Sequence, residues 1–267
     1  MSIRHAPYAD AAADFAIGLR PIEPADWFEP GDADPARKDA LLASEGAAVW
    51  GETEGSLPGQ SEVLDLVAAA TRATPEGGLP PLWAASRLVA DDLCLMEKRD
   101  LGWTLTAVSL CSGSFFTAAD ALGKSLGELH GPVPAFGDRF LGRVGRIFDG
   151  LAPATIVERR NWTVVNTDGL YLPRSAPIRE RIGEIGAADA AEALFVRVER
   201  QTLRRLPNTG GVIFTIRVWR HPLSALRDQP ERLAAFAEAW RTATPEFRAY
   251  KGLHLYDELI EAFLAGA

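Results

Sequence analysis

Apolar and polar residues follow two different periods along this chain of 267 residues. Alternating and continuous apolar runs predict about five extended strands, and short turns join the first to the second and the fourth to the fifth. The predicted strands span residues 88–97, 103–111, 154–166, 194–203 and 212–219. Because consecutive strands on short turns favour antiparallel pairing, the pattern predicts an antiparallel sheet.

Apolar residues at helical spacing predict helices between and around these strands. Residues 36–50 and 59–73 should form helices before the sheet, and the chain from Pro230 on should form helices after it. Two further helices, over 118–129 and 140–148, are inserted between the second and third strands. Thr117 and Asp120 would cap the first of these inserted helices. The predicted fold class is therefore α+β, with inserted and flanking helices.

Composition divides the chain into three parts. Residues 1–40 are rich in Pro, Asp and Gly, which predicts an irregular lead-in that Trp27 and Phe28 anchor on the core. Residues 41–228 hold the predicted strands and form the main domain. Residues 229–267 should be C-terminal helices that pack on the same domain.

The net charge and the number of cysteines limit the classes of function that this protein can have. A formal net charge of -8 argues against nucleic-acid binding, which requires a basic face. The N-terminus lacks the apolar core of a signal peptide, and apolar runs fall short of the roughly 18 residues that span a bilayer. A cytoplasmic protein without membrane contact is expected. Cys94 and Cys111 are too few for a disulfide framework or an iron–sulfur cluster.

Several common catalytic motifs are missing from the sequence. GxGxxG at a strand–helix junction, GxxxxGK[ST], GxSxG and HExxH do not occur. The serines of CSGSF resemble a nucleophile only superficially, and a turn is the better interpretation. Nucleotide cradles, serine hydrolases and zinc peptidases are therefore disfavoured.

His130 is the one histidine with a well-defined predicted setting. It ends the helix over 118–129 and precedes the stiff turn Gly131-Pro132-Val133-Pro134. One interpretation is an ordinary helix-end residue, since imidazolium suits the helix dipole. The other is an axial haem ligand, because haem requires only one ligand from the protein. Position alone leaves both open.

Arginines gather on the last three predicted strands, at 159–160, 197–205 and Arg217. They could form a solvated face with glutamate partners, or they could recognise carboxylates through the guanidinium fork. Alternation puts Arg197, Glu199 and Gln201 on one face. Whether Arg217 faces Glu199 or Arg200 depends on the register of the last hairpin.

Several motifs together resemble the haem-dependent oxidative N-demethylase family. They are GLRPIEPADW (18–27), DDLCLM (91–96), LHGPVPAF (129–136), NW (161–162) and ERQTLRRLPNTGGVIFTIRVW (199–219). The resemblance implies that residues 41–228 form a haem-binding PAS-like domain with a sheet of about five strands. It also implies oxidation of a small, dimethylamine-like methylated amine with dioxygen at haem b. Electrons would come from NADPH through FMN and an iron–sulfur cluster on separate reductase subunits.

The resemblance also assigns roles to residues of this sequence. His130 becomes the expected iron ligand, and Glu199 and Arg217 become candidate catalytic residues. The other expected cofactor-binding residues are Pro132, Asn161, Trp162, Arg200 and Arg204. The segment Ser112–Phe116 departs from the family pattern, in which a proline and a tryptophan are expected. The alternative is a haem-binding PAS-like sensor or ligand-binding protein without catalysis.

Overall fold

The computed structural model describes residues 3–10, 13–31, 33–100, 102–134 and 136–266. Within them, seven strands form one open antiparallel sheet in the order β1-β5-β6-β7-β3-β4-β2. The strands are β1 (Arg20–Ile22), β2 (Trp50–Glu52), β3 (Asp92–Arg99), β4 (Gly102–Ser109), β5 (Ile156–Val165), β6 (Phe195–Arg205) and β7 (Val212–Pro222). The predicted α+β class is confirmed.

The predicted count of five strands is too low because two short edge strands were missed. β1 and β2 have three residues each, too few to show an alternating pattern. β1 pairs with β5 at one edge, and β2 pairs with β4 at the other. The helix predicted over 36–50 also ends early, since α1 stops at Glu45 and Trp50 begins β2.

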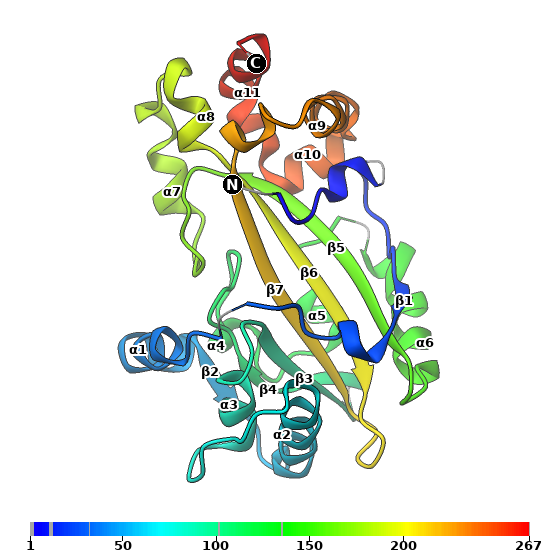
Figure 1. Ribbon diagram of the computed structural model, residues 1–267. Helices are drawn as coiled ribbons and strands as arrows, with labels where there is room; N and C mark the ends of the chain where they lie inside the picture. The colour runs from blue at the N-terminus through cyan, green and yellow to red at the C-terminus, as the bar shows by residue number, and fades with distance from the viewer. Residues whose placement is uncertain (1–2, 11–12, 32, 101, 135, 267) are drawn as a thin grey trace.

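Helices surround the sheet, and most lie where the apolar spacing predicts them. The described residues form α1 (Pro35–Glu45), α2 (Leu57–Thr71), α3 (Pro81–Ser86), α4 (Ala118–Ala121), α5 (Leu126–Leu129), α6 (Gly142–Gly150), α7 (Ala176–Glu180), α8 (Ala190–Ala193), α9 (Pro230–Thr242), α10 (Pro245–Lys251) and α11 (Asp257–Ala265). The long strands β5, β6 and β7 cross the centre of the molecule. Helices α9–α11 lie at one end of these strands, and α1–α3 lie at the other (Figure 1).

The two faces of the sheet carry different elements. On one, which we call the α5 face, Leu203 and Ile216 pack with Leu126 and Phe148 from α5 and α6. On the other, which we call the lead-in face, Trp27 packs with Ile213 and with residues of α2 and α3. Further along the same face, Val196 and Val198 pack with Tyr8 and with α9–α11. Residues that alternate along β6 therefore belong to two different environments.

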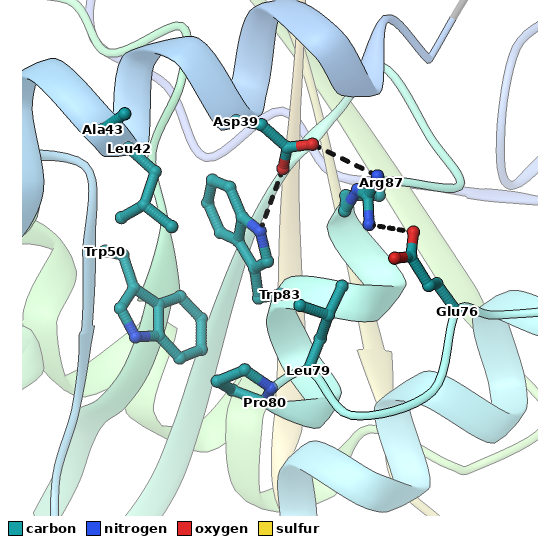
Figure 2. Close-up of a pocket in the computed structure, with 9 residues that line it drawn as sticks. All are labelled: Asp39, Leu42, Ala43, Trp50, Glu76, Leu79, Pro80, Trp83 and Arg87. Carbon is teal, nitrogen blue, oxygen red and sulfur yellow. Dashed lines mark hydrogen bonds and ion pairs between the residues drawn. The ribbon is translucent and has the colours of Figure 1, made fainter.

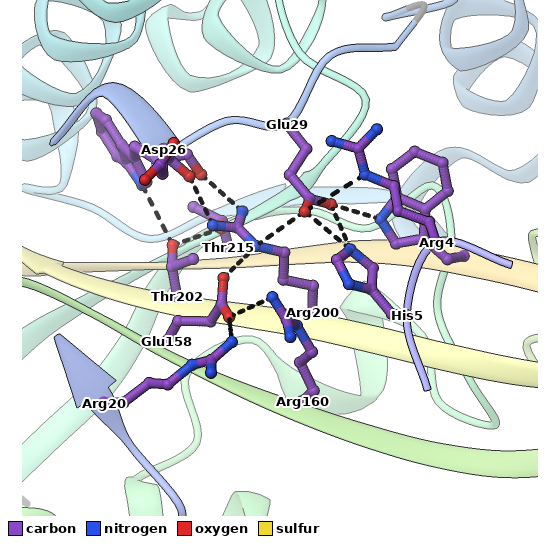
Figure 3. A network of polar contacts seen from close by, with 12 residues as sticks. Arg4, His5, Arg20, Asp26, Glu29, Glu158, Arg160, Arg200, Thr202 and Thr215 are labelled. Atoms are coloured by element: carbon purple, nitrogen blue, oxygen red, sulfur yellow. Dashed lines mark hydrogen bonds and ion pairs between the residues drawn. The ribbon is translucent and has the colours of Figure 1, made fainter. Parts of the chain in front are cut away.

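A polar network fixes the lead-in to its face (Figure 3). The Glu158 carboxylate is 2% exposed and receives ion pairs from three guanidiniums. They belong to Arg20, Arg160 and Arg200. Arg200 also donates to the backbone oxygens of Asp26 at 2.6 Å and Trp27 at 2.8 Å. Arg160 and Arg200 lie opposite each other on neighbouring strands, and their like charges repel. The buried Glu158 carboxylate and the two backbone carbonyls stabilise these guanidiniums in this arrangement.

Candidate functional site

The segment before His130 forms two short helices, so the prediction of one continuous helix over 118–129 is wrong. Gly123 has a φ of +78° and separates α4 from α5. The predicted capping box of Thr117 and Asp120 is confirmed at the start of α4. A second capping box, Ser125 with Glu128, starts α5. His130 follows α5 as its C-cap residue, at the end of this well-capped turn.

Two contacts hold the His130 imidazole. Nδ1 lies 2.9 Å from the Leu126 carbonyl oxygen, which can only accept, so Nδ1 carries the proton and donates. The Phe136 ring stacks on the imidazole at 4.1 Å between centroids and 9° between planes. Burial lowers the pKa of His130, and the charge of Arg159 lowers it further. The neutral imidazole therefore presents Nε2 as a lone-pair donor.

The turn after His130 brings Phe136 back over the ring. The Val133 amide donates to the His130 carbonyl at 2.9 Å, and the Phe136 amide donates to the Val133 carbonyl at 3.2 Å. Pro132 lies exposed inside this turn. Its fixed φ stiffens the turn, so Pro132 acts on the histidine through the backbone conformation.

Glu199 projects from β6 on the α5 face. Its carboxylate accepts hydrogen bonds from the Ser114 hydroxyl and, at 3.0 Å, from the Gln201 amide. Ser114 in turn accepts from Arg197 Nε at 2.9 Å. Arg197 is 1% exposed, and its other nitrogens donate to backbone carbonyls of the 112–114 and 169–170 loops. The carboxylate is thus fixed in one orientation by a fully bonded support.

Two basic residues lie on or beside β5, Arg159 within the strand and Lys251 next to its uncovered edge. Strand register puts Asn161 opposite Glu199 and Arg159 opposite Gln201, all on the α5 face. Lys251, the last residue of α10, is held by a 3.4 Å hydrogen bond from Thr163 Oγ1 to its carbonyl. Burial lowers the pKa of Lys251 to about 8, although the Glu199 charge opposes this. Arg159 and Lys251 were not predicted as site residues.

Four predicted site residues lie on the lead-in face, away from Glu199. Strand register pairs Arg217 with Arg200 and Glu199 with Val218, so of the two alternatives that the sequence left open, Arg217 shares a face with Arg200 and not with Glu199. Arg200 is 2% exposed and belongs to the Glu158 network. The other three residues pack against aromatic rings. Arg204 stacks on Trp27 at 4.4 Å, Arg217 stacks on Trp219 at 4.7 Å, and Trp162 packs against Tyr8 and Phe236.

The structure therefore brings together part of the predicted set. His130 follows α5, which packs on the same face of the sheet as Glu199 and Asn161. The charge of Arg159 lowers the pKa of His130, and the charge of Glu199 opposes the lowering of the Arg159 pKa by burial. His130, Glu199, Asn161 and Arg159 therefore belong to one side of the sheet.

A profile of haem-dependent oxidative N-demethylase, alpha subunit-like, matches residues 61–260. This range is three quarters of the chain and includes every residue of the site described above. The chain belongs to this family. A comparison with curated proteins finds no match.

The residues present fit the haem on which the family depends. Within the described residues His130 Nε2 has no hydrogen-bond partner, and the Nδ1–H bond to a carbonyl is the usual second contact of an iron-bound histidine. Apolar side chains from the sheet and from α5 and α6 pack together on this side of the sheet. They include Leu129, Val144, Val157 and Phe214, which are partly buried. Among the described residues, no three His, Cys, Asp or Glu side chains converge to bind a metal ion.

A cavity of about 410 Å³ lies elsewhere, between α1, β2 and α3 (Figure 2). Trp50 and Trp83 form its apolar walls, and Arg87 joins Asp39 to Glu76 at its rim. It contains none of the predicted site residues, so sequence and structure do not connect it with the family's chemistry.

No helix in the described ranges is long and apolar enough to cross a membrane.

Proposed function

We propose that the chain binds haem b through His130 and uses it to demethylate a small methylated amine with dioxygen. The observation that carries the proposal is that His130 and Glu199 lie on the same side of one sheet, in a chain of the N-demethylase family. The sheet with α4–α6 would be the PAS-like unit that holds the cofactor. When bound, the haem supplies the activation of dioxygen and the electron-transfer chemistry.

In this proposal His130 Nε2 would bind the haem iron. Its Nδ1–H bond to the Leu126 carbonyl fixes the tautomer and makes the imidazole more basic as a ligand. The stacked Phe136 ring restricts rotation of the imidazole. Both contacts come from the same short segment, so the ligand is held in place before any cofactor arrives.

Glu199 is proposed to bind the amine substrate. A small secondary amine is protonated at neutral pH, and a carboxylate is the natural partner of its N–H groups. Ser114 and Gln201 hold the carboxylate in place while one of its lone pairs remains available. Glu199 would also take the proton that the amine must lose before oxidation.

Electrons are proposed to come from a separate reductase. The family is defined by an alpha subunit, which supports partner subunits. Cys94 and Cys111 are both buried, and the sequence lacks the phosphate-binding motifs for flavin or NADPH. FMN, an iron–sulfur cluster and NADPH would therefore belong to the partner.

Formaldehyde release tests the proposal. Haem-loaded protein with dimethylamine, dioxygen and an artificial electron donor should release formaldehyde, while the same amount of free haem should release much less. A panel of methylated amines would then identify the preferred substrate. Stable haem binding without formaldehyde from any amine of the panel would contradict the enzymatic proposal and favour a sensor or ligand-binding role.

A further inference from the structure

The cavity between α1, β2 and α3 has two indole rings as walls, and these rings meet edge to face. Trp50 begins β2 and Trp83 belongs to α3, with 5.8 Å between the ring centroids and 73° between the ring planes. Leu42, Leu79 and Pro80 complete the apolar lining (Figure 2). The volume of about 410 Å³ lies in the range of small-molecule sites. The two indoles therefore form adjoining walls of one space that is large enough for a ligand.

The fold holds both walls in place before any ligand binds. Trp83 is 2% exposed, packs with Val49 and Cys111, and donates from Nε1 to Asp39 Oδ1 at 3.3 Å. Trp50 is half-buried and is fixed by the pairing of β2 with β4. Trp83 therefore forms the inner wall, and Trp50 forms the wall that a ligand meets first from solvent.

The rim of the cavity carries more negative than positive charge. Arg87 pairs with Asp39 at 3.1 Å and also with Glu76, so two carboxylates share one guanidinium and one negative charge stays unbalanced. The side chains of Asp39 and Glu76 are 43% and 65% exposed, whereas that of Arg87 is 20% exposed. Because the carboxylates are more exposed to solvent than the guanidinium that they hold, the rim attracts cations and repels anions.

The apolar lining selects the kind of cation. An ammonium ion with N–H groups would lose hydrogen bonds to water beside Leu42, Leu79 and Pro80. A quaternary ammonium ion has no N–H groups to satisfy, and its methyl groups can pack on this lining. The face of an indole ring attracts such a charge more strongly than the other aromatic side chains do. The cavity therefore suits a cation whose nitrogen is fully alkylated.

We propose that this cavity binds a quaternary ammonium ion of about the size of choline. Its alkylated nitrogen lies against Trp50 and Trp83, and its charge is balanced by the rim carboxylates Asp39 and Glu76. A hydroxyl on the same ion can donate to either of them, since a carboxylate that pairs with a guanidinium keeps lone pairs that accept. The cavity contains none of the residues assigned to haem or amine, so this site goes beyond the proposed function and does not require the haem.

The experiment compares choline with 3,3-dimethylbutan-1-ol, which has the same shape but carries a tert-butyl group in place of the trimethylammonium group. The dissociation constant of each is measured with the full chain by NMR titration of the ligand's methyl signal. Choline should bind about 10-fold more tightly than the alcohol, an effect between those of exposed and of desolvated cation–π contacts. Trp50→Leu keeps an apolar wall without an indole face, so it should weaken choline binding about 10-fold and alcohol binding less than about two-fold. Trp50→Phe keeps a weaker aromatic face and should lose less than Trp50→Leu.

Charge variants test the rim. Asp39→Asn and Glu76→Gln should each weaken choline binding about three-fold, because each removes one exposed negative charge. Asp65→Asn is the matched control, since it removes the same charge from an exposed position on α2 outside the cavity and should change nothing. Glu199→Gln should also bind choline normally.

Three results would overturn the assignment. They are equal affinity for choline and the alcohol, no binding of choline, and equal losses of both ligands in Trp50→Leu. A loss in Glu199→Gln together with normal binding by Trp50→Leu would move the cation to the candidate active site and overturn it as well. If Trp50→Leu does not fold, the two ligands on the unaltered chain and on Asp39→Asn still decide. Each of these results leaves the proposed function untouched, because haem binding and formaldehyde release are measured separately.

Discussion

The His130 imidazole is oriented by contacts from its own segment, four residues before it and six residues after it. The Leu126 carbonyl fixes the proton on Nδ1, and Phe136 covers one face of the ring. The capping box of Ser125 and Glu128 holds the turn that supplies this carbonyl. A ligand built from local contacts needs no long-range adjustment to present Nε2.

Glu199→Gln tests the second residue of the site. Glutamine has nearly the same shape but cannot take the proton of a bound ammonium ion. We expect kcat/KM for the amine to fall about 10²-fold, the lower range for loss of a general base. The haem spectrum should stay unchanged, because the iron ligand is on another element.

Ser114→Ala is the matched control for that substitution. It removes one hydrogen bond to the carboxylate but leaves the base in place, so a loss of roughly five-fold is expected. A variant Glu199→Gln that demethylates at the normal rate would show that this carboxylate takes no part in the reaction.

The sequence predicts some site residues better than others. His130 and Glu199 stand in specific motifs, and alternation correctly puts Glu199 with Arg197. Alternation along β5 also separates Arg159 from Arg160, so the face of Arg159 can be predicted from the sequence. Lys251 is far along the chain, and only the packing of α10 beside β5 brings it to the site.

The lead-in element is part of the folded core. Trp27 is fully buried, packs with residues of α2 and α3, and donates from Nε1 to Thr202 Oγ1 at 3.2 Å. We expect Trp27→Ala to lower the free energy of unfolding by about 3–5 kcal/mol, measured by urea denaturation. Leu57→Ala, at a side chain that is 59% exposed, should change it by less than about 0.5 kcal/mol. A small loss for Trp27→Ala would mean that the lead-in contributes little to the core.

Glu29 makes the stability that the lead-in contributes to the fold depend on pH. Burial alone would raise the pKa of Glu29, but hydrogen bonds and charges from His5, Arg200 and Trp219 lower it to about 2. A lowered carboxyl pKa stabilises the fold fully above the unfolded pKa, near 4.5, and this contribution is lost as the pH falls towards 2. Glu29→Gln should therefore cost roughly 2–3 kcal/mol at pH 7.

The difference in unfolding free energy between the unaltered chain and Glu29→Gln should shrink to less than half at about pH 3, because Glu29 is then almost fully protonated in the unfolded chain. Urea denaturation at both pH values measures it. Glu261→Gln, at an exposed glutamate, is the control and should show almost no difference at either pH. A constant penalty for Glu29→Gln across this range would rule out an electrostatic origin.

Strands and helices differ in how far the sequence predicts them. The five long strands follow from alternation over eight or more residues, whereas β1 and β2 are too short to show it. The 118–129 segment keeps helical apolar spacing across its break, so only Gly123 and the second capping box signal two helices. The register of the β6–β7 hairpin, which separates Arg217 from Glu199, is not fixed by its turn sequence.

In the whole molecule, the two faces of the sheet have different roles. The lead-in face buries a row of arginines against carboxylates and carbonyls, which makes it structural. Among the described residues, the α5 face carries a histidine Nε2 without a hydrogen-bond partner, a fixed carboxylate and unpaired arginines such as Arg159. The function of this family member is therefore expected on the side of the sheet that α4–α6 cover.

Haem ligation by His130 is the central claim, and one absorbance measurement tests it. Haem added to the unaltered chain should give a Soret band that shifts with dithionite and carbon monoxide. His130→Ala should remove or shift this band, and added imidazole should restore it. His254→Ala, at an exposed histidine, should match the unaltered chain. A His130→Ala protein with an unchanged haem spectrum would contradict the account.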